Sequence, residues 1–303
     1  MLPKSYSYFP RVLLALSLVL QVAALAVDES SAQTRRQRQA RSQASHPRHG
    51  MPPVDRDLVE RGITAVCMER VRDPKGSVPI DDMQTRPSLP LGSPEAVEGA
   101  ERAQRLLPLA KSLVVKSMNQ LTERFGLSRK IRLQGAIARV QAVRRIRPDM
   151  ESRDNASVYL RTPHTITFGT IFLASLPSDE AMLSVLSHEL LHIADGDQDS
   201  LRLLFRAVGD RASNLTALTV HRQRAEELTC DLVGAMAARA FISQTPGYEP
   251  LTRRISRAVA HNCVTEDEGD EDHLSPRNTI RALLTIDPKL TKELVYGTEE
   301  DPD

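Results

Sequence analysis

The chain has no tryptophan, few other aromatic residues and no marked excess of either charge. Its 303 residues include 6 Phe and 5 Tyr, and 40 Lys and Arg stand against 39 Asp and Glu, for a formal net charge of +1. Balanced charge gives no general argument for a nucleic-acid partner, so none is expected. No internal repeat is visible, which argues against a built-in repeat scaffold. The length suits one large or two small domains.

Residues 1–26 have the three parts of an export signal. Lys4 and Arg11 supply a charged start, Val12 to Val22 an apolar run, and Ala24-Leu25-Ala26 a small-x-small cleavage site. The apolar run is short for a full membrane span, so an uncleaved N-terminal anchor is the less favoured alternative. The residue directly after the expected cleavage site is Val27 rather than cysteine, which argues against a bacterial lipid anchor. We therefore expect an exported protein, periplasmic or secreted, with no integral membrane span after signal removal.

Residues 27–97 are expected to precede the folded domain, and within them Val59 to Val71 could form a short helix that contains Cys67. Residues 28–50 are rich in Ser, Gln and Arg and cannot bury enough apolar surface, so we expect a disordered basic linker. Contact of this segment with anionic lipid or nucleic acid is the alternative, and a solvated linker is favoured. Residues 51–97 form a Pro-rich N-terminal segment, and the expected folded domain covers residues 98–303.

Residues 188–192 read H-E-x-x-H inside an apolar helical pattern. His188 and His192 lie four residues apart on one helical face, where both imidazoles can reach a single metal ion. Zinc accepts imidazole nitrogens, and a catalytic zinc site keeps one coordination position for water. Glu189 is then placed to take a proton from that water. The alternative is a helix that carries two histidines without a metal, and the features around the motif favour the metal site.

The features on both sides of this motif predict a well-formed helix. Ser178 can cap its start, with Asp179 and Glu180 in the first turn, where acidic side chains complement the helix dipole. Gly196 offers a stop just past its end. The pattern between these points is apolar nearly all round, which is typical of a buried helix.

A third metal ligand is expected from a second helix. Glu227 and Asp231 are four residues apart and share a helical face, and Glu227 would complete a two-His-one-Glu set. Asp231 could accept a hydrogen bond from the far nitrogen of a ligand histidine and fix its tautomer. The alternative is a solvated acidic helix turn, and Glu226 is interpreted in that way.

H-E-x-x-H followed by E-x-x-x-D resembles the gluzincin zinc metallopeptidases. The fuller pattern R-x-x-E-x-x-x-D, from Arg224 to Asp231, is similar to the HtpX / CAAX prenyl protease family, in the style of its soluble periplasmic BepA-type members. The resemblance covers about residues 110–295. Two flanking regions resemble further segments of that family: Asn155-Ala156 with residues 165–169, and residues 273–276 with residues 280–283.

Three departures from the family pattern matter. Only 34 residues (193–226) separate His192 from Glu227, which leaves little room for a hairpin or membrane spans there. Cys230 stands where the family usually has Ala, which is a small change. In the late segment, Leu274 stands where the family has Pro after His. Thr279 stands where the family has a late Arg, so a transition-state role for that Arg does not carry over.

The resemblance implies an α+β, mainly helical fold: a zincin-like metallopeptidase domain with a small β-sheet and one Zn²⁺ per chain. It also implies that a strand before the metal helix binds substrate as an added strand. β-branched and aromatic residues predict such a strand at Thr165, Ile166, Thr167 and Phe168. Residues 131–147 would be strand by resemblance, and a helix there remains open.

The function expected from these residues is that of an exported zinc-dependent endopeptidase. It would hydrolyse peptide bonds of protein or peptide substrates, and its expected role is envelope protein quality control. The alternative is a zinc-stabilised, chaperone-like envelope assembly factor with little or no proteolysis. The oligomeric state stays open.

His273 has three open interpretations. In some periplasmic relatives a histidine from this region approaches the zinc and occupies its open position, which would make His273 a removable plug. As a transition-state hydrogen-bond donor it would instead assist the reaction. As a surface histidine it would cap the helix that follows.

The chain has three cysteines, an odd number, whereas an even number is expected where cysteines pair in an oxidising compartment. Cys230 takes a small-residue position in the ligand helix and is predicted to be a buried free thiol. Cys67 and Cys263 could then form a disulfide, and three free thiols remain the alternative.

Overall fold

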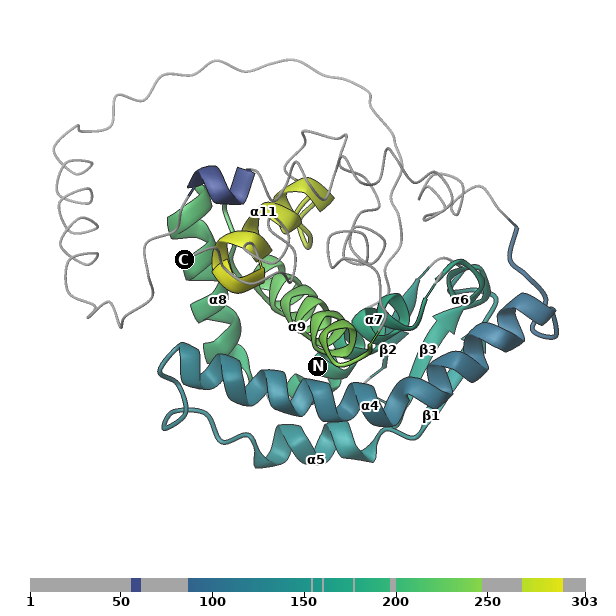
Figure 1. The fold of residues 1–303 in the computed structure, drawn as a ribbon. Coiled ribbons are helices and arrows are strands. Elements are labelled where there is room, and N and C mark those ends of the chain that lie inside the picture. Colours follow the sequence, from purple (N-terminus) through teal and green to yellow (C-terminus); the bar gives the residue numbers. More distant parts are fainter. Residues whose placement is uncertain are drawn as a thin grey trace, which may run out of the picture. The chain divides into compact units, whose positions relative to one another are not determined.

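The structure, a computed structural model, describes residues 56–60, 87–153, 155–159, 161–176, 178–196, 200–246 and 269–290 (Figure 1). These residues all belong to one compact unit. The expected signal peptide, most of the expected linker, and Cys67 and Cys263 lie outside the described residues. Among the described residues, no helix combines the length and apolar character that a membrane span requires.

The described part is mainly helical with one small sheet, which confirms the α+β class (Figure 1). The helices are α4 (Pro94–Arg124), α5 (Gln134–Ala142), α6 (Thr170–Ser175), α7 (Asp179–Asp195), α8 (Arg202–Thr216), α9 (Gln223–Ser243) and α11 (Pro276–Ile286). The strands are β1 (Arg145–Asp149), β2 (Ala156–Val158) and β3 (Thr165–Gly169).

The sheet has the strand order β1-β3-β2, so β3 is its central strand. β1 pairs with β3 in parallel, with Ile146 opposite Ile166, and β2 pairs with β3 antiparallel, with Ser157 opposite Thr167. Both edges of β3 are therefore occupied by protein. The expectation that Thr165–Phe168 takes substrate as an added strand is wrong, because an added strand needs a free edge.

Residues 94–149 form α4, α5 and β1, and the expectation for residues 131–147 is refined. Residues 131–147 contain both a helix and a strand, α5 and then β1. α4 runs uninterrupted through Pro108, which lies on its exposed side. α4 starts at Pro94 behind the cap residue Ser93.

α7 and α9 pack against each other at the centre of the fold and carry the H-E-x-x-H and E-x-x-x-D motifs. α7 is buried, as its apolar pattern predicts. The Ser178 side chain accepts a hydrogen bond from the backbone N–H of Ala181, and Gly196 ends the helix with a φ of 64°, so both predicted ends are confirmed. Arg139 of α5 donates to the carbonyl oxygens of the last turn of α7 and thereby holds its C-terminal end.

Candidate metal centre

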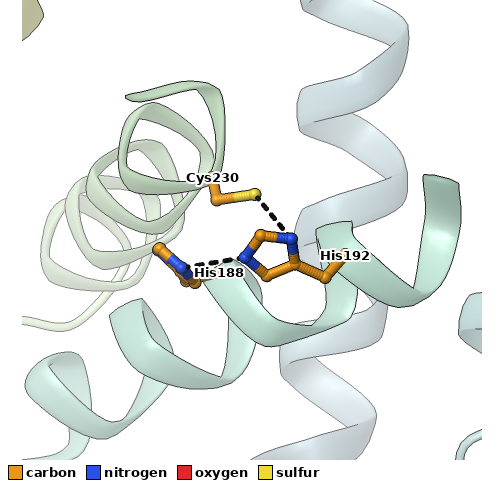
Figure 2. Close-up of side chains that lie close together, drawn as sticks. All are labelled: His188, His192 and Cys230. Carbon is orange, nitrogen blue, oxygen red and sulfur yellow. Dashed lines mark hydrogen bonds between the residues drawn. The ribbon is translucent and has the colours of Figure 1, made fainter. Parts of the chain in front are cut away.

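The two motif histidines face the same point from successive turns of α7 (Figure 2). Their Nε2 atoms lie 3.2 Å apart, and the ring centroids lie 5.0 Å apart in an edge-on arrangement. Both side chains are largely buried. The four-residue spacing thus brings two imidazole nitrogens together, as the helical period requires.

α9 brings Glu227 to the same point. Its Oε2 lies 3.2 Å from His188 Nε2 and 3.5 Å from His192 Nε2, and its side chain is 4% exposed. One turn further along α9, Asp231 Oδ1 lies 2.9 Å from His188 Nδ1. Glu227 therefore contacts the Nε2 atoms of both histidines, and Asp231 contacts the Nδ1 atom of His188.

Glu226 is the residue whose role the sequence interpretation missed. Its Oε1 lies 3.0 Å from His192 Nδ1, and its side chain is only 18% exposed, so the interpretation as a solvated helix turn is wrong. The four-residue spacing of side chains on α9 is the sequence signal that could have predicted this contact. Glu226 and Cys230 are four residues apart, as are Glu227 and Asp231, so α9 presents two adjacent rows of side chains to α7.

Cys230 completes a group that can hold a metal ion. His188, His192 and Cys230 offer donor atoms that all lie within 4.8 Å of one another (Figure 2). Cys230 Sγ lies 3.8 Å from His192 Nδ1, and the thiol is buried and free, which confirms the free-thiol prediction. Burial raises the pKa of this thiol to about 11. The thiolate is the form that binds a metal, so binding at Cys230 would release this proton.

His273 reaches the site from the turn before α11. Its Nε2 lies 3.4 Å from Glu227 Oε2, its Nδ1 lies 3.4 Å from Asp270 Oδ1, and its side chain is 34% exposed. α11 begins behind Ser275 and has no side-chain cap. The interpretation of His273 as a surface residue that caps this helix is therefore wrong.

The turn that carries His273 is held in place by local contacts. Gly269 and Leu274 form an antiparallel bridge across it, and the Asp270 carboxylate accepts hydrogen bonds from the backbone N–H groups of Asp272 and His273. Arg224, in the first turn of α9, donates to the carbonyl oxygen of Asp270. The ligand helix itself thus fixes the turn next to the site.

The charges around the paired imidazoles favour positive charge between them. Burial lowers the pKa of His188 and His192, but neighbouring acidic groups outweigh burial and hold both values well above the ordinary one. Burial raises the pKa of Glu227, but the two histidines outweigh it and hold that value well below the ordinary one. A proton or a metal cation can supply this charge, and the two compete for the same nitrogens.

Glu189 lies beside His188 in α7 and is buried, with 7% of its surface exposed. Burial raises the pKa of its carboxyl group against the opposing effect of the two histidines. A carboxylate with a raised pKa is a stronger base than an ordinary one, which suits a group that must accept a proton.

Comparison of the chain with protein-family models, with curated proteins and with solved structures found no match. An interpretation of the site therefore depends on the chemistry and geometry of its own residues.

Proposed function

We propose that the chain is a zinc-dependent endopeptidase in which His188, His192 and Glu227 hold the metal. The observation that supports this most directly is the spacing of three atoms, the two Nε2 atoms and Glu227 Oε2, at 3.2, 3.2 and 3.5 Å. A tetrahedral zinc ion with nitrogen and oxygen ligands at about 2.0–2.1 Å holds those ligands about 3.3–3.4 Å apart. The three atoms therefore have the spacing of three corners of a zinc site.

Glu227 fits the third ligand position better than Cys230. Cys230 Sγ contacts His192 Nδ1, the nitrogen that Glu226 also contacts, whereas Glu227 contacts the Nε2 atoms of both rings. The lone pairs of Nδ1 and Nε2 point away from different sides of an imidazole, so one metal cannot use both sides of His192. Cys230 then lines the site without binding the ion.

The chain's residues have distinct tasks in peptide hydrolysis. Zinc bound at this point would polarise a scissile carbonyl and lower the pKa of its bound water. Glu189 takes a proton from the attacking water and returns it to the leaving amine. Asp231 holds His188 by its Nδ1 and keeps the Nε2 lone pair directed to the metal.

β2 is the strand that suits a peptide substrate. It pairs with β3 along one side and, among the described strands, is an edge of the sheet. It also packs against α7, the helix that carries Glu189. An extended peptide that pairs with Ala156–Val158 would gain backbone hydrogen bonds beside the site.

His273 is the candidate for the fourth corner of this arrangement. Its Nε2 lies 3.4 Å from Glu227 Oε2, which is the spacing expected between two ligands of one zinc ion. An imidazole in that position takes the place of the water that hydrolysis needs. We therefore propose that His273 acts as a plug rather than as a transition-state donor. The enzyme would then stay latent until the turn at residues 269–274 moves.

The same contact favours a second candidate function. Structural zinc sites have four protein ligands and no open position. With His273 as a permanent fourth ligand, the protein would be a zinc-stabilised, chaperone-like envelope assembly factor with little or no proteolysis. Because residues 1–26 have the parts of an export signal, we propose that the peptidase acts outside the cytoplasm, in envelope protein quality control.

Metal content and peptidase activity, measured together on the full chain, test the proposal. We expect about one zinc per chain and casein hydrolysis that a chelator abolishes and added zinc restores. One zinc per chain without hydrolysis, in the wild type and in His273→Ala alike, would favour the assembly factor. A chain that binds no zinc contradicts both candidates.

A further inference from the structure

We propose that Glu226 is a positioning residue that orients His192 for metal binding, as Asp231 orients His188. The inference rests on the proposed zinc site. It adds a residue that neither the H-E-x-x-H nor the E-x-x-x-D pattern contains.

The contact of Glu226 with His192 has the geometry of a carboxylate–imidazole hydrogen bond. Glu226 Oε1 lies 3.0 Å from Nδ1, on the side of the ring opposite to Glu227. A neutral imidazole carries its proton on one nitrogen only. When Nδ1 donates its proton to Glu226, Nε2 keeps a free lone pair directed at His188 Nε2 and Glu227 Oε2.

Each imidazole of the pair therefore has its own carboxylate next to its Nδ1 atom. Asp231 Oδ1 lies 2.9 Å from His188 Nδ1, and Glu226 Oε1 lies 3.0 Å from His192 Nδ1. Both acids come from α9, so packing of one helix against α7 sets the orientation of both rings. Ligand histidines held in this way are more basic and lose less rotational freedom when they bind a metal.

Cys230 cannot replace Glu226 in this role. Its Sγ lies 3.8 Å from the same Nδ1, which is the longer of the two contacts, and sulfur of a neutral thiol accepts hydrogen bonds weakly. A hydrogen bond to an ionised carboxylate is shorter and about twice as strong as one between neutral groups. The Nδ1 proton is therefore held by Glu226.

A simpler role for Glu226 is to complement the dipole of α9, since it lies in the first turn of that helix. The two roles differ in what they require. An aspartate at this position keeps the negative charge near the helix start but is one methylene too short to keep the ring contact. A glutamine keeps the length and an accepting oxygen but loses the charge.

Zinc affinity of the full chain, measured by competition with a chelator of known affinity, separates these roles. We expect Glu226→Ala and Glu226→Asp to bind zinc about 10- to 100-fold more weakly than the wild type. Glu226→Gln should lose less than Glu226→Ala, because its amide oxygen still accepts the Nδ1 proton. Glu101→Ala, an exposed change on α4, is the control and should leave the affinity unchanged.

The tautomer of His192 is a second measurement. A role of Glu226 in the helix dipole alone would not change it. In long-range ¹H–¹⁵N spectra of the zinc-loaded wild type, we expect a slowly exchanging Nδ1 proton on His192. That proton should exchange rapidly in Glu226→Ala and stay protected in Glu226→Gln. The comparison of Gln with Asp also avoids dependence on the alanine variant, should that variant fail to fold.

Wild-type affinity in Glu226→Asp would assign the residue to the helix dipole and overturn the proposal. Wild-type affinity in Glu226→Ala would overturn it as well. A wild-type chain that binds no zinc contradicts the proposed function instead. The exchange of the His192 Nδ1 proton in the metal-free chain would then still decide whether Glu226 holds the ring.

Discussion

At the scale of single residues, the site consists of groups whose neighbours decide their chemistry. Glu189 and Glu227 are both buried glutamates, yet burial raises the pKa of one and the paired imidazoles lower the pKa of the other. A low pKa suits a group that stays ionised as a metal ligand, and a raised pKa suits a proton acceptor. The two carboxylates are thus fitted to different tasks.

Replacement of Glu189 by Gln should separate hydrolysis from metal binding. The change keeps size and shape but removes the proton acceptor, so we expect activity to fall by a factor of about 10²–10⁴ or more with zinc content unchanged. Casein hydrolysis and metal analysis of the same preparation measure both. Glu101→Gln, an exposed change on α4, should leave both unchanged. Full activity in Glu189→Gln would contradict the mechanism.

Replacement of His273 by Ala should raise basal peptidase activity if the imidazole occupies the fourth corner. Removal of a plug frees the position that water needs, whereas removal of a transition-state donor lowers the rate. The initial rate of peptide hydrolysis, compared with the wild type at equal zinc content, measures the sign. Arg277→Ala, four residues further along the chain, serves as the control. An unchanged rate would contradict both functional roles.

At the scale of elements, the site depends on the distance between α7 and α9. α7 is held at its start by Ser178 and at its end by Arg139. α9 approaches it so closely at Gly234 that an added Cβ would lie 2.7 Å from the carbonyl oxygen of Ser184. Glu227 lies about two helical turns from this contact, so the close approach helps to set its distance from the histidines.

Gly234→Ala should therefore weaken metal binding although it touches no ligand. The methyl group must push the two helices apart, and we expect a loss of about 1–3 kcal/mol of stability together with lower zinc affinity. Thermal unfolding and chelator competition measure the two effects. Gly92→Ala is the matched control, because a Cβ there meets nothing within 4 Å. Equal behaviour of the two variants would contradict the role of this helix contact.

At the scale of the whole molecule, the two histidines of the candidate metal site link folding to pH. The pKa of His188 and of His192 is raised in the folded chain, so protonation of these rings stabilises the metal-free protein at low pH. That contribution is fully present below the ordinary histidine value and is lost as the pH rises through the raised values. Zinc needs the deprotonated rings, so its contribution changes in the opposite direction.

The stabilisation by zinc should consequently increase as the pH rises from below the ordinary histidine pKa toward the raised pKa values of His188 and His192. Each proton released on binding makes the apparent affinity rise about tenfold per pH unit, and tighter binding raises the melting temperature. Melting temperatures with zinc and with chelator, compared across this range, measure the gain. The exposed residue His164 is not involved, so His164→Gln should show the same increase. A gain that does not depend on pH would contradict the linkage.

Local spacing alone was enough to predict the helix α7 and several of the residues that meet at the candidate metal centre. The ends at Ser178 and Gly196, and the placement of Glu227 and Asp231 on one face of a helix, follow from capping chemistry and the helical period. These properties depend on residues within one turn or one helix of each other. A sequence displays such relations directly, because neighbours in the helix are near neighbours in the chain.

Strand order, by contrast, was decided only by the tertiary structure. β3 has the same strand propensity whether it is central or at an edge, and only its pairing with β1 and β2 shows that it is central. Glu226 and His273 likewise acquire their roles from the faces that α9 and the turn before α11 present to α7. The period of a helix specifies which of its own residues share a face. It does not specify which other element that face will meet, because that contact forms only when distant parts of the chain pack together.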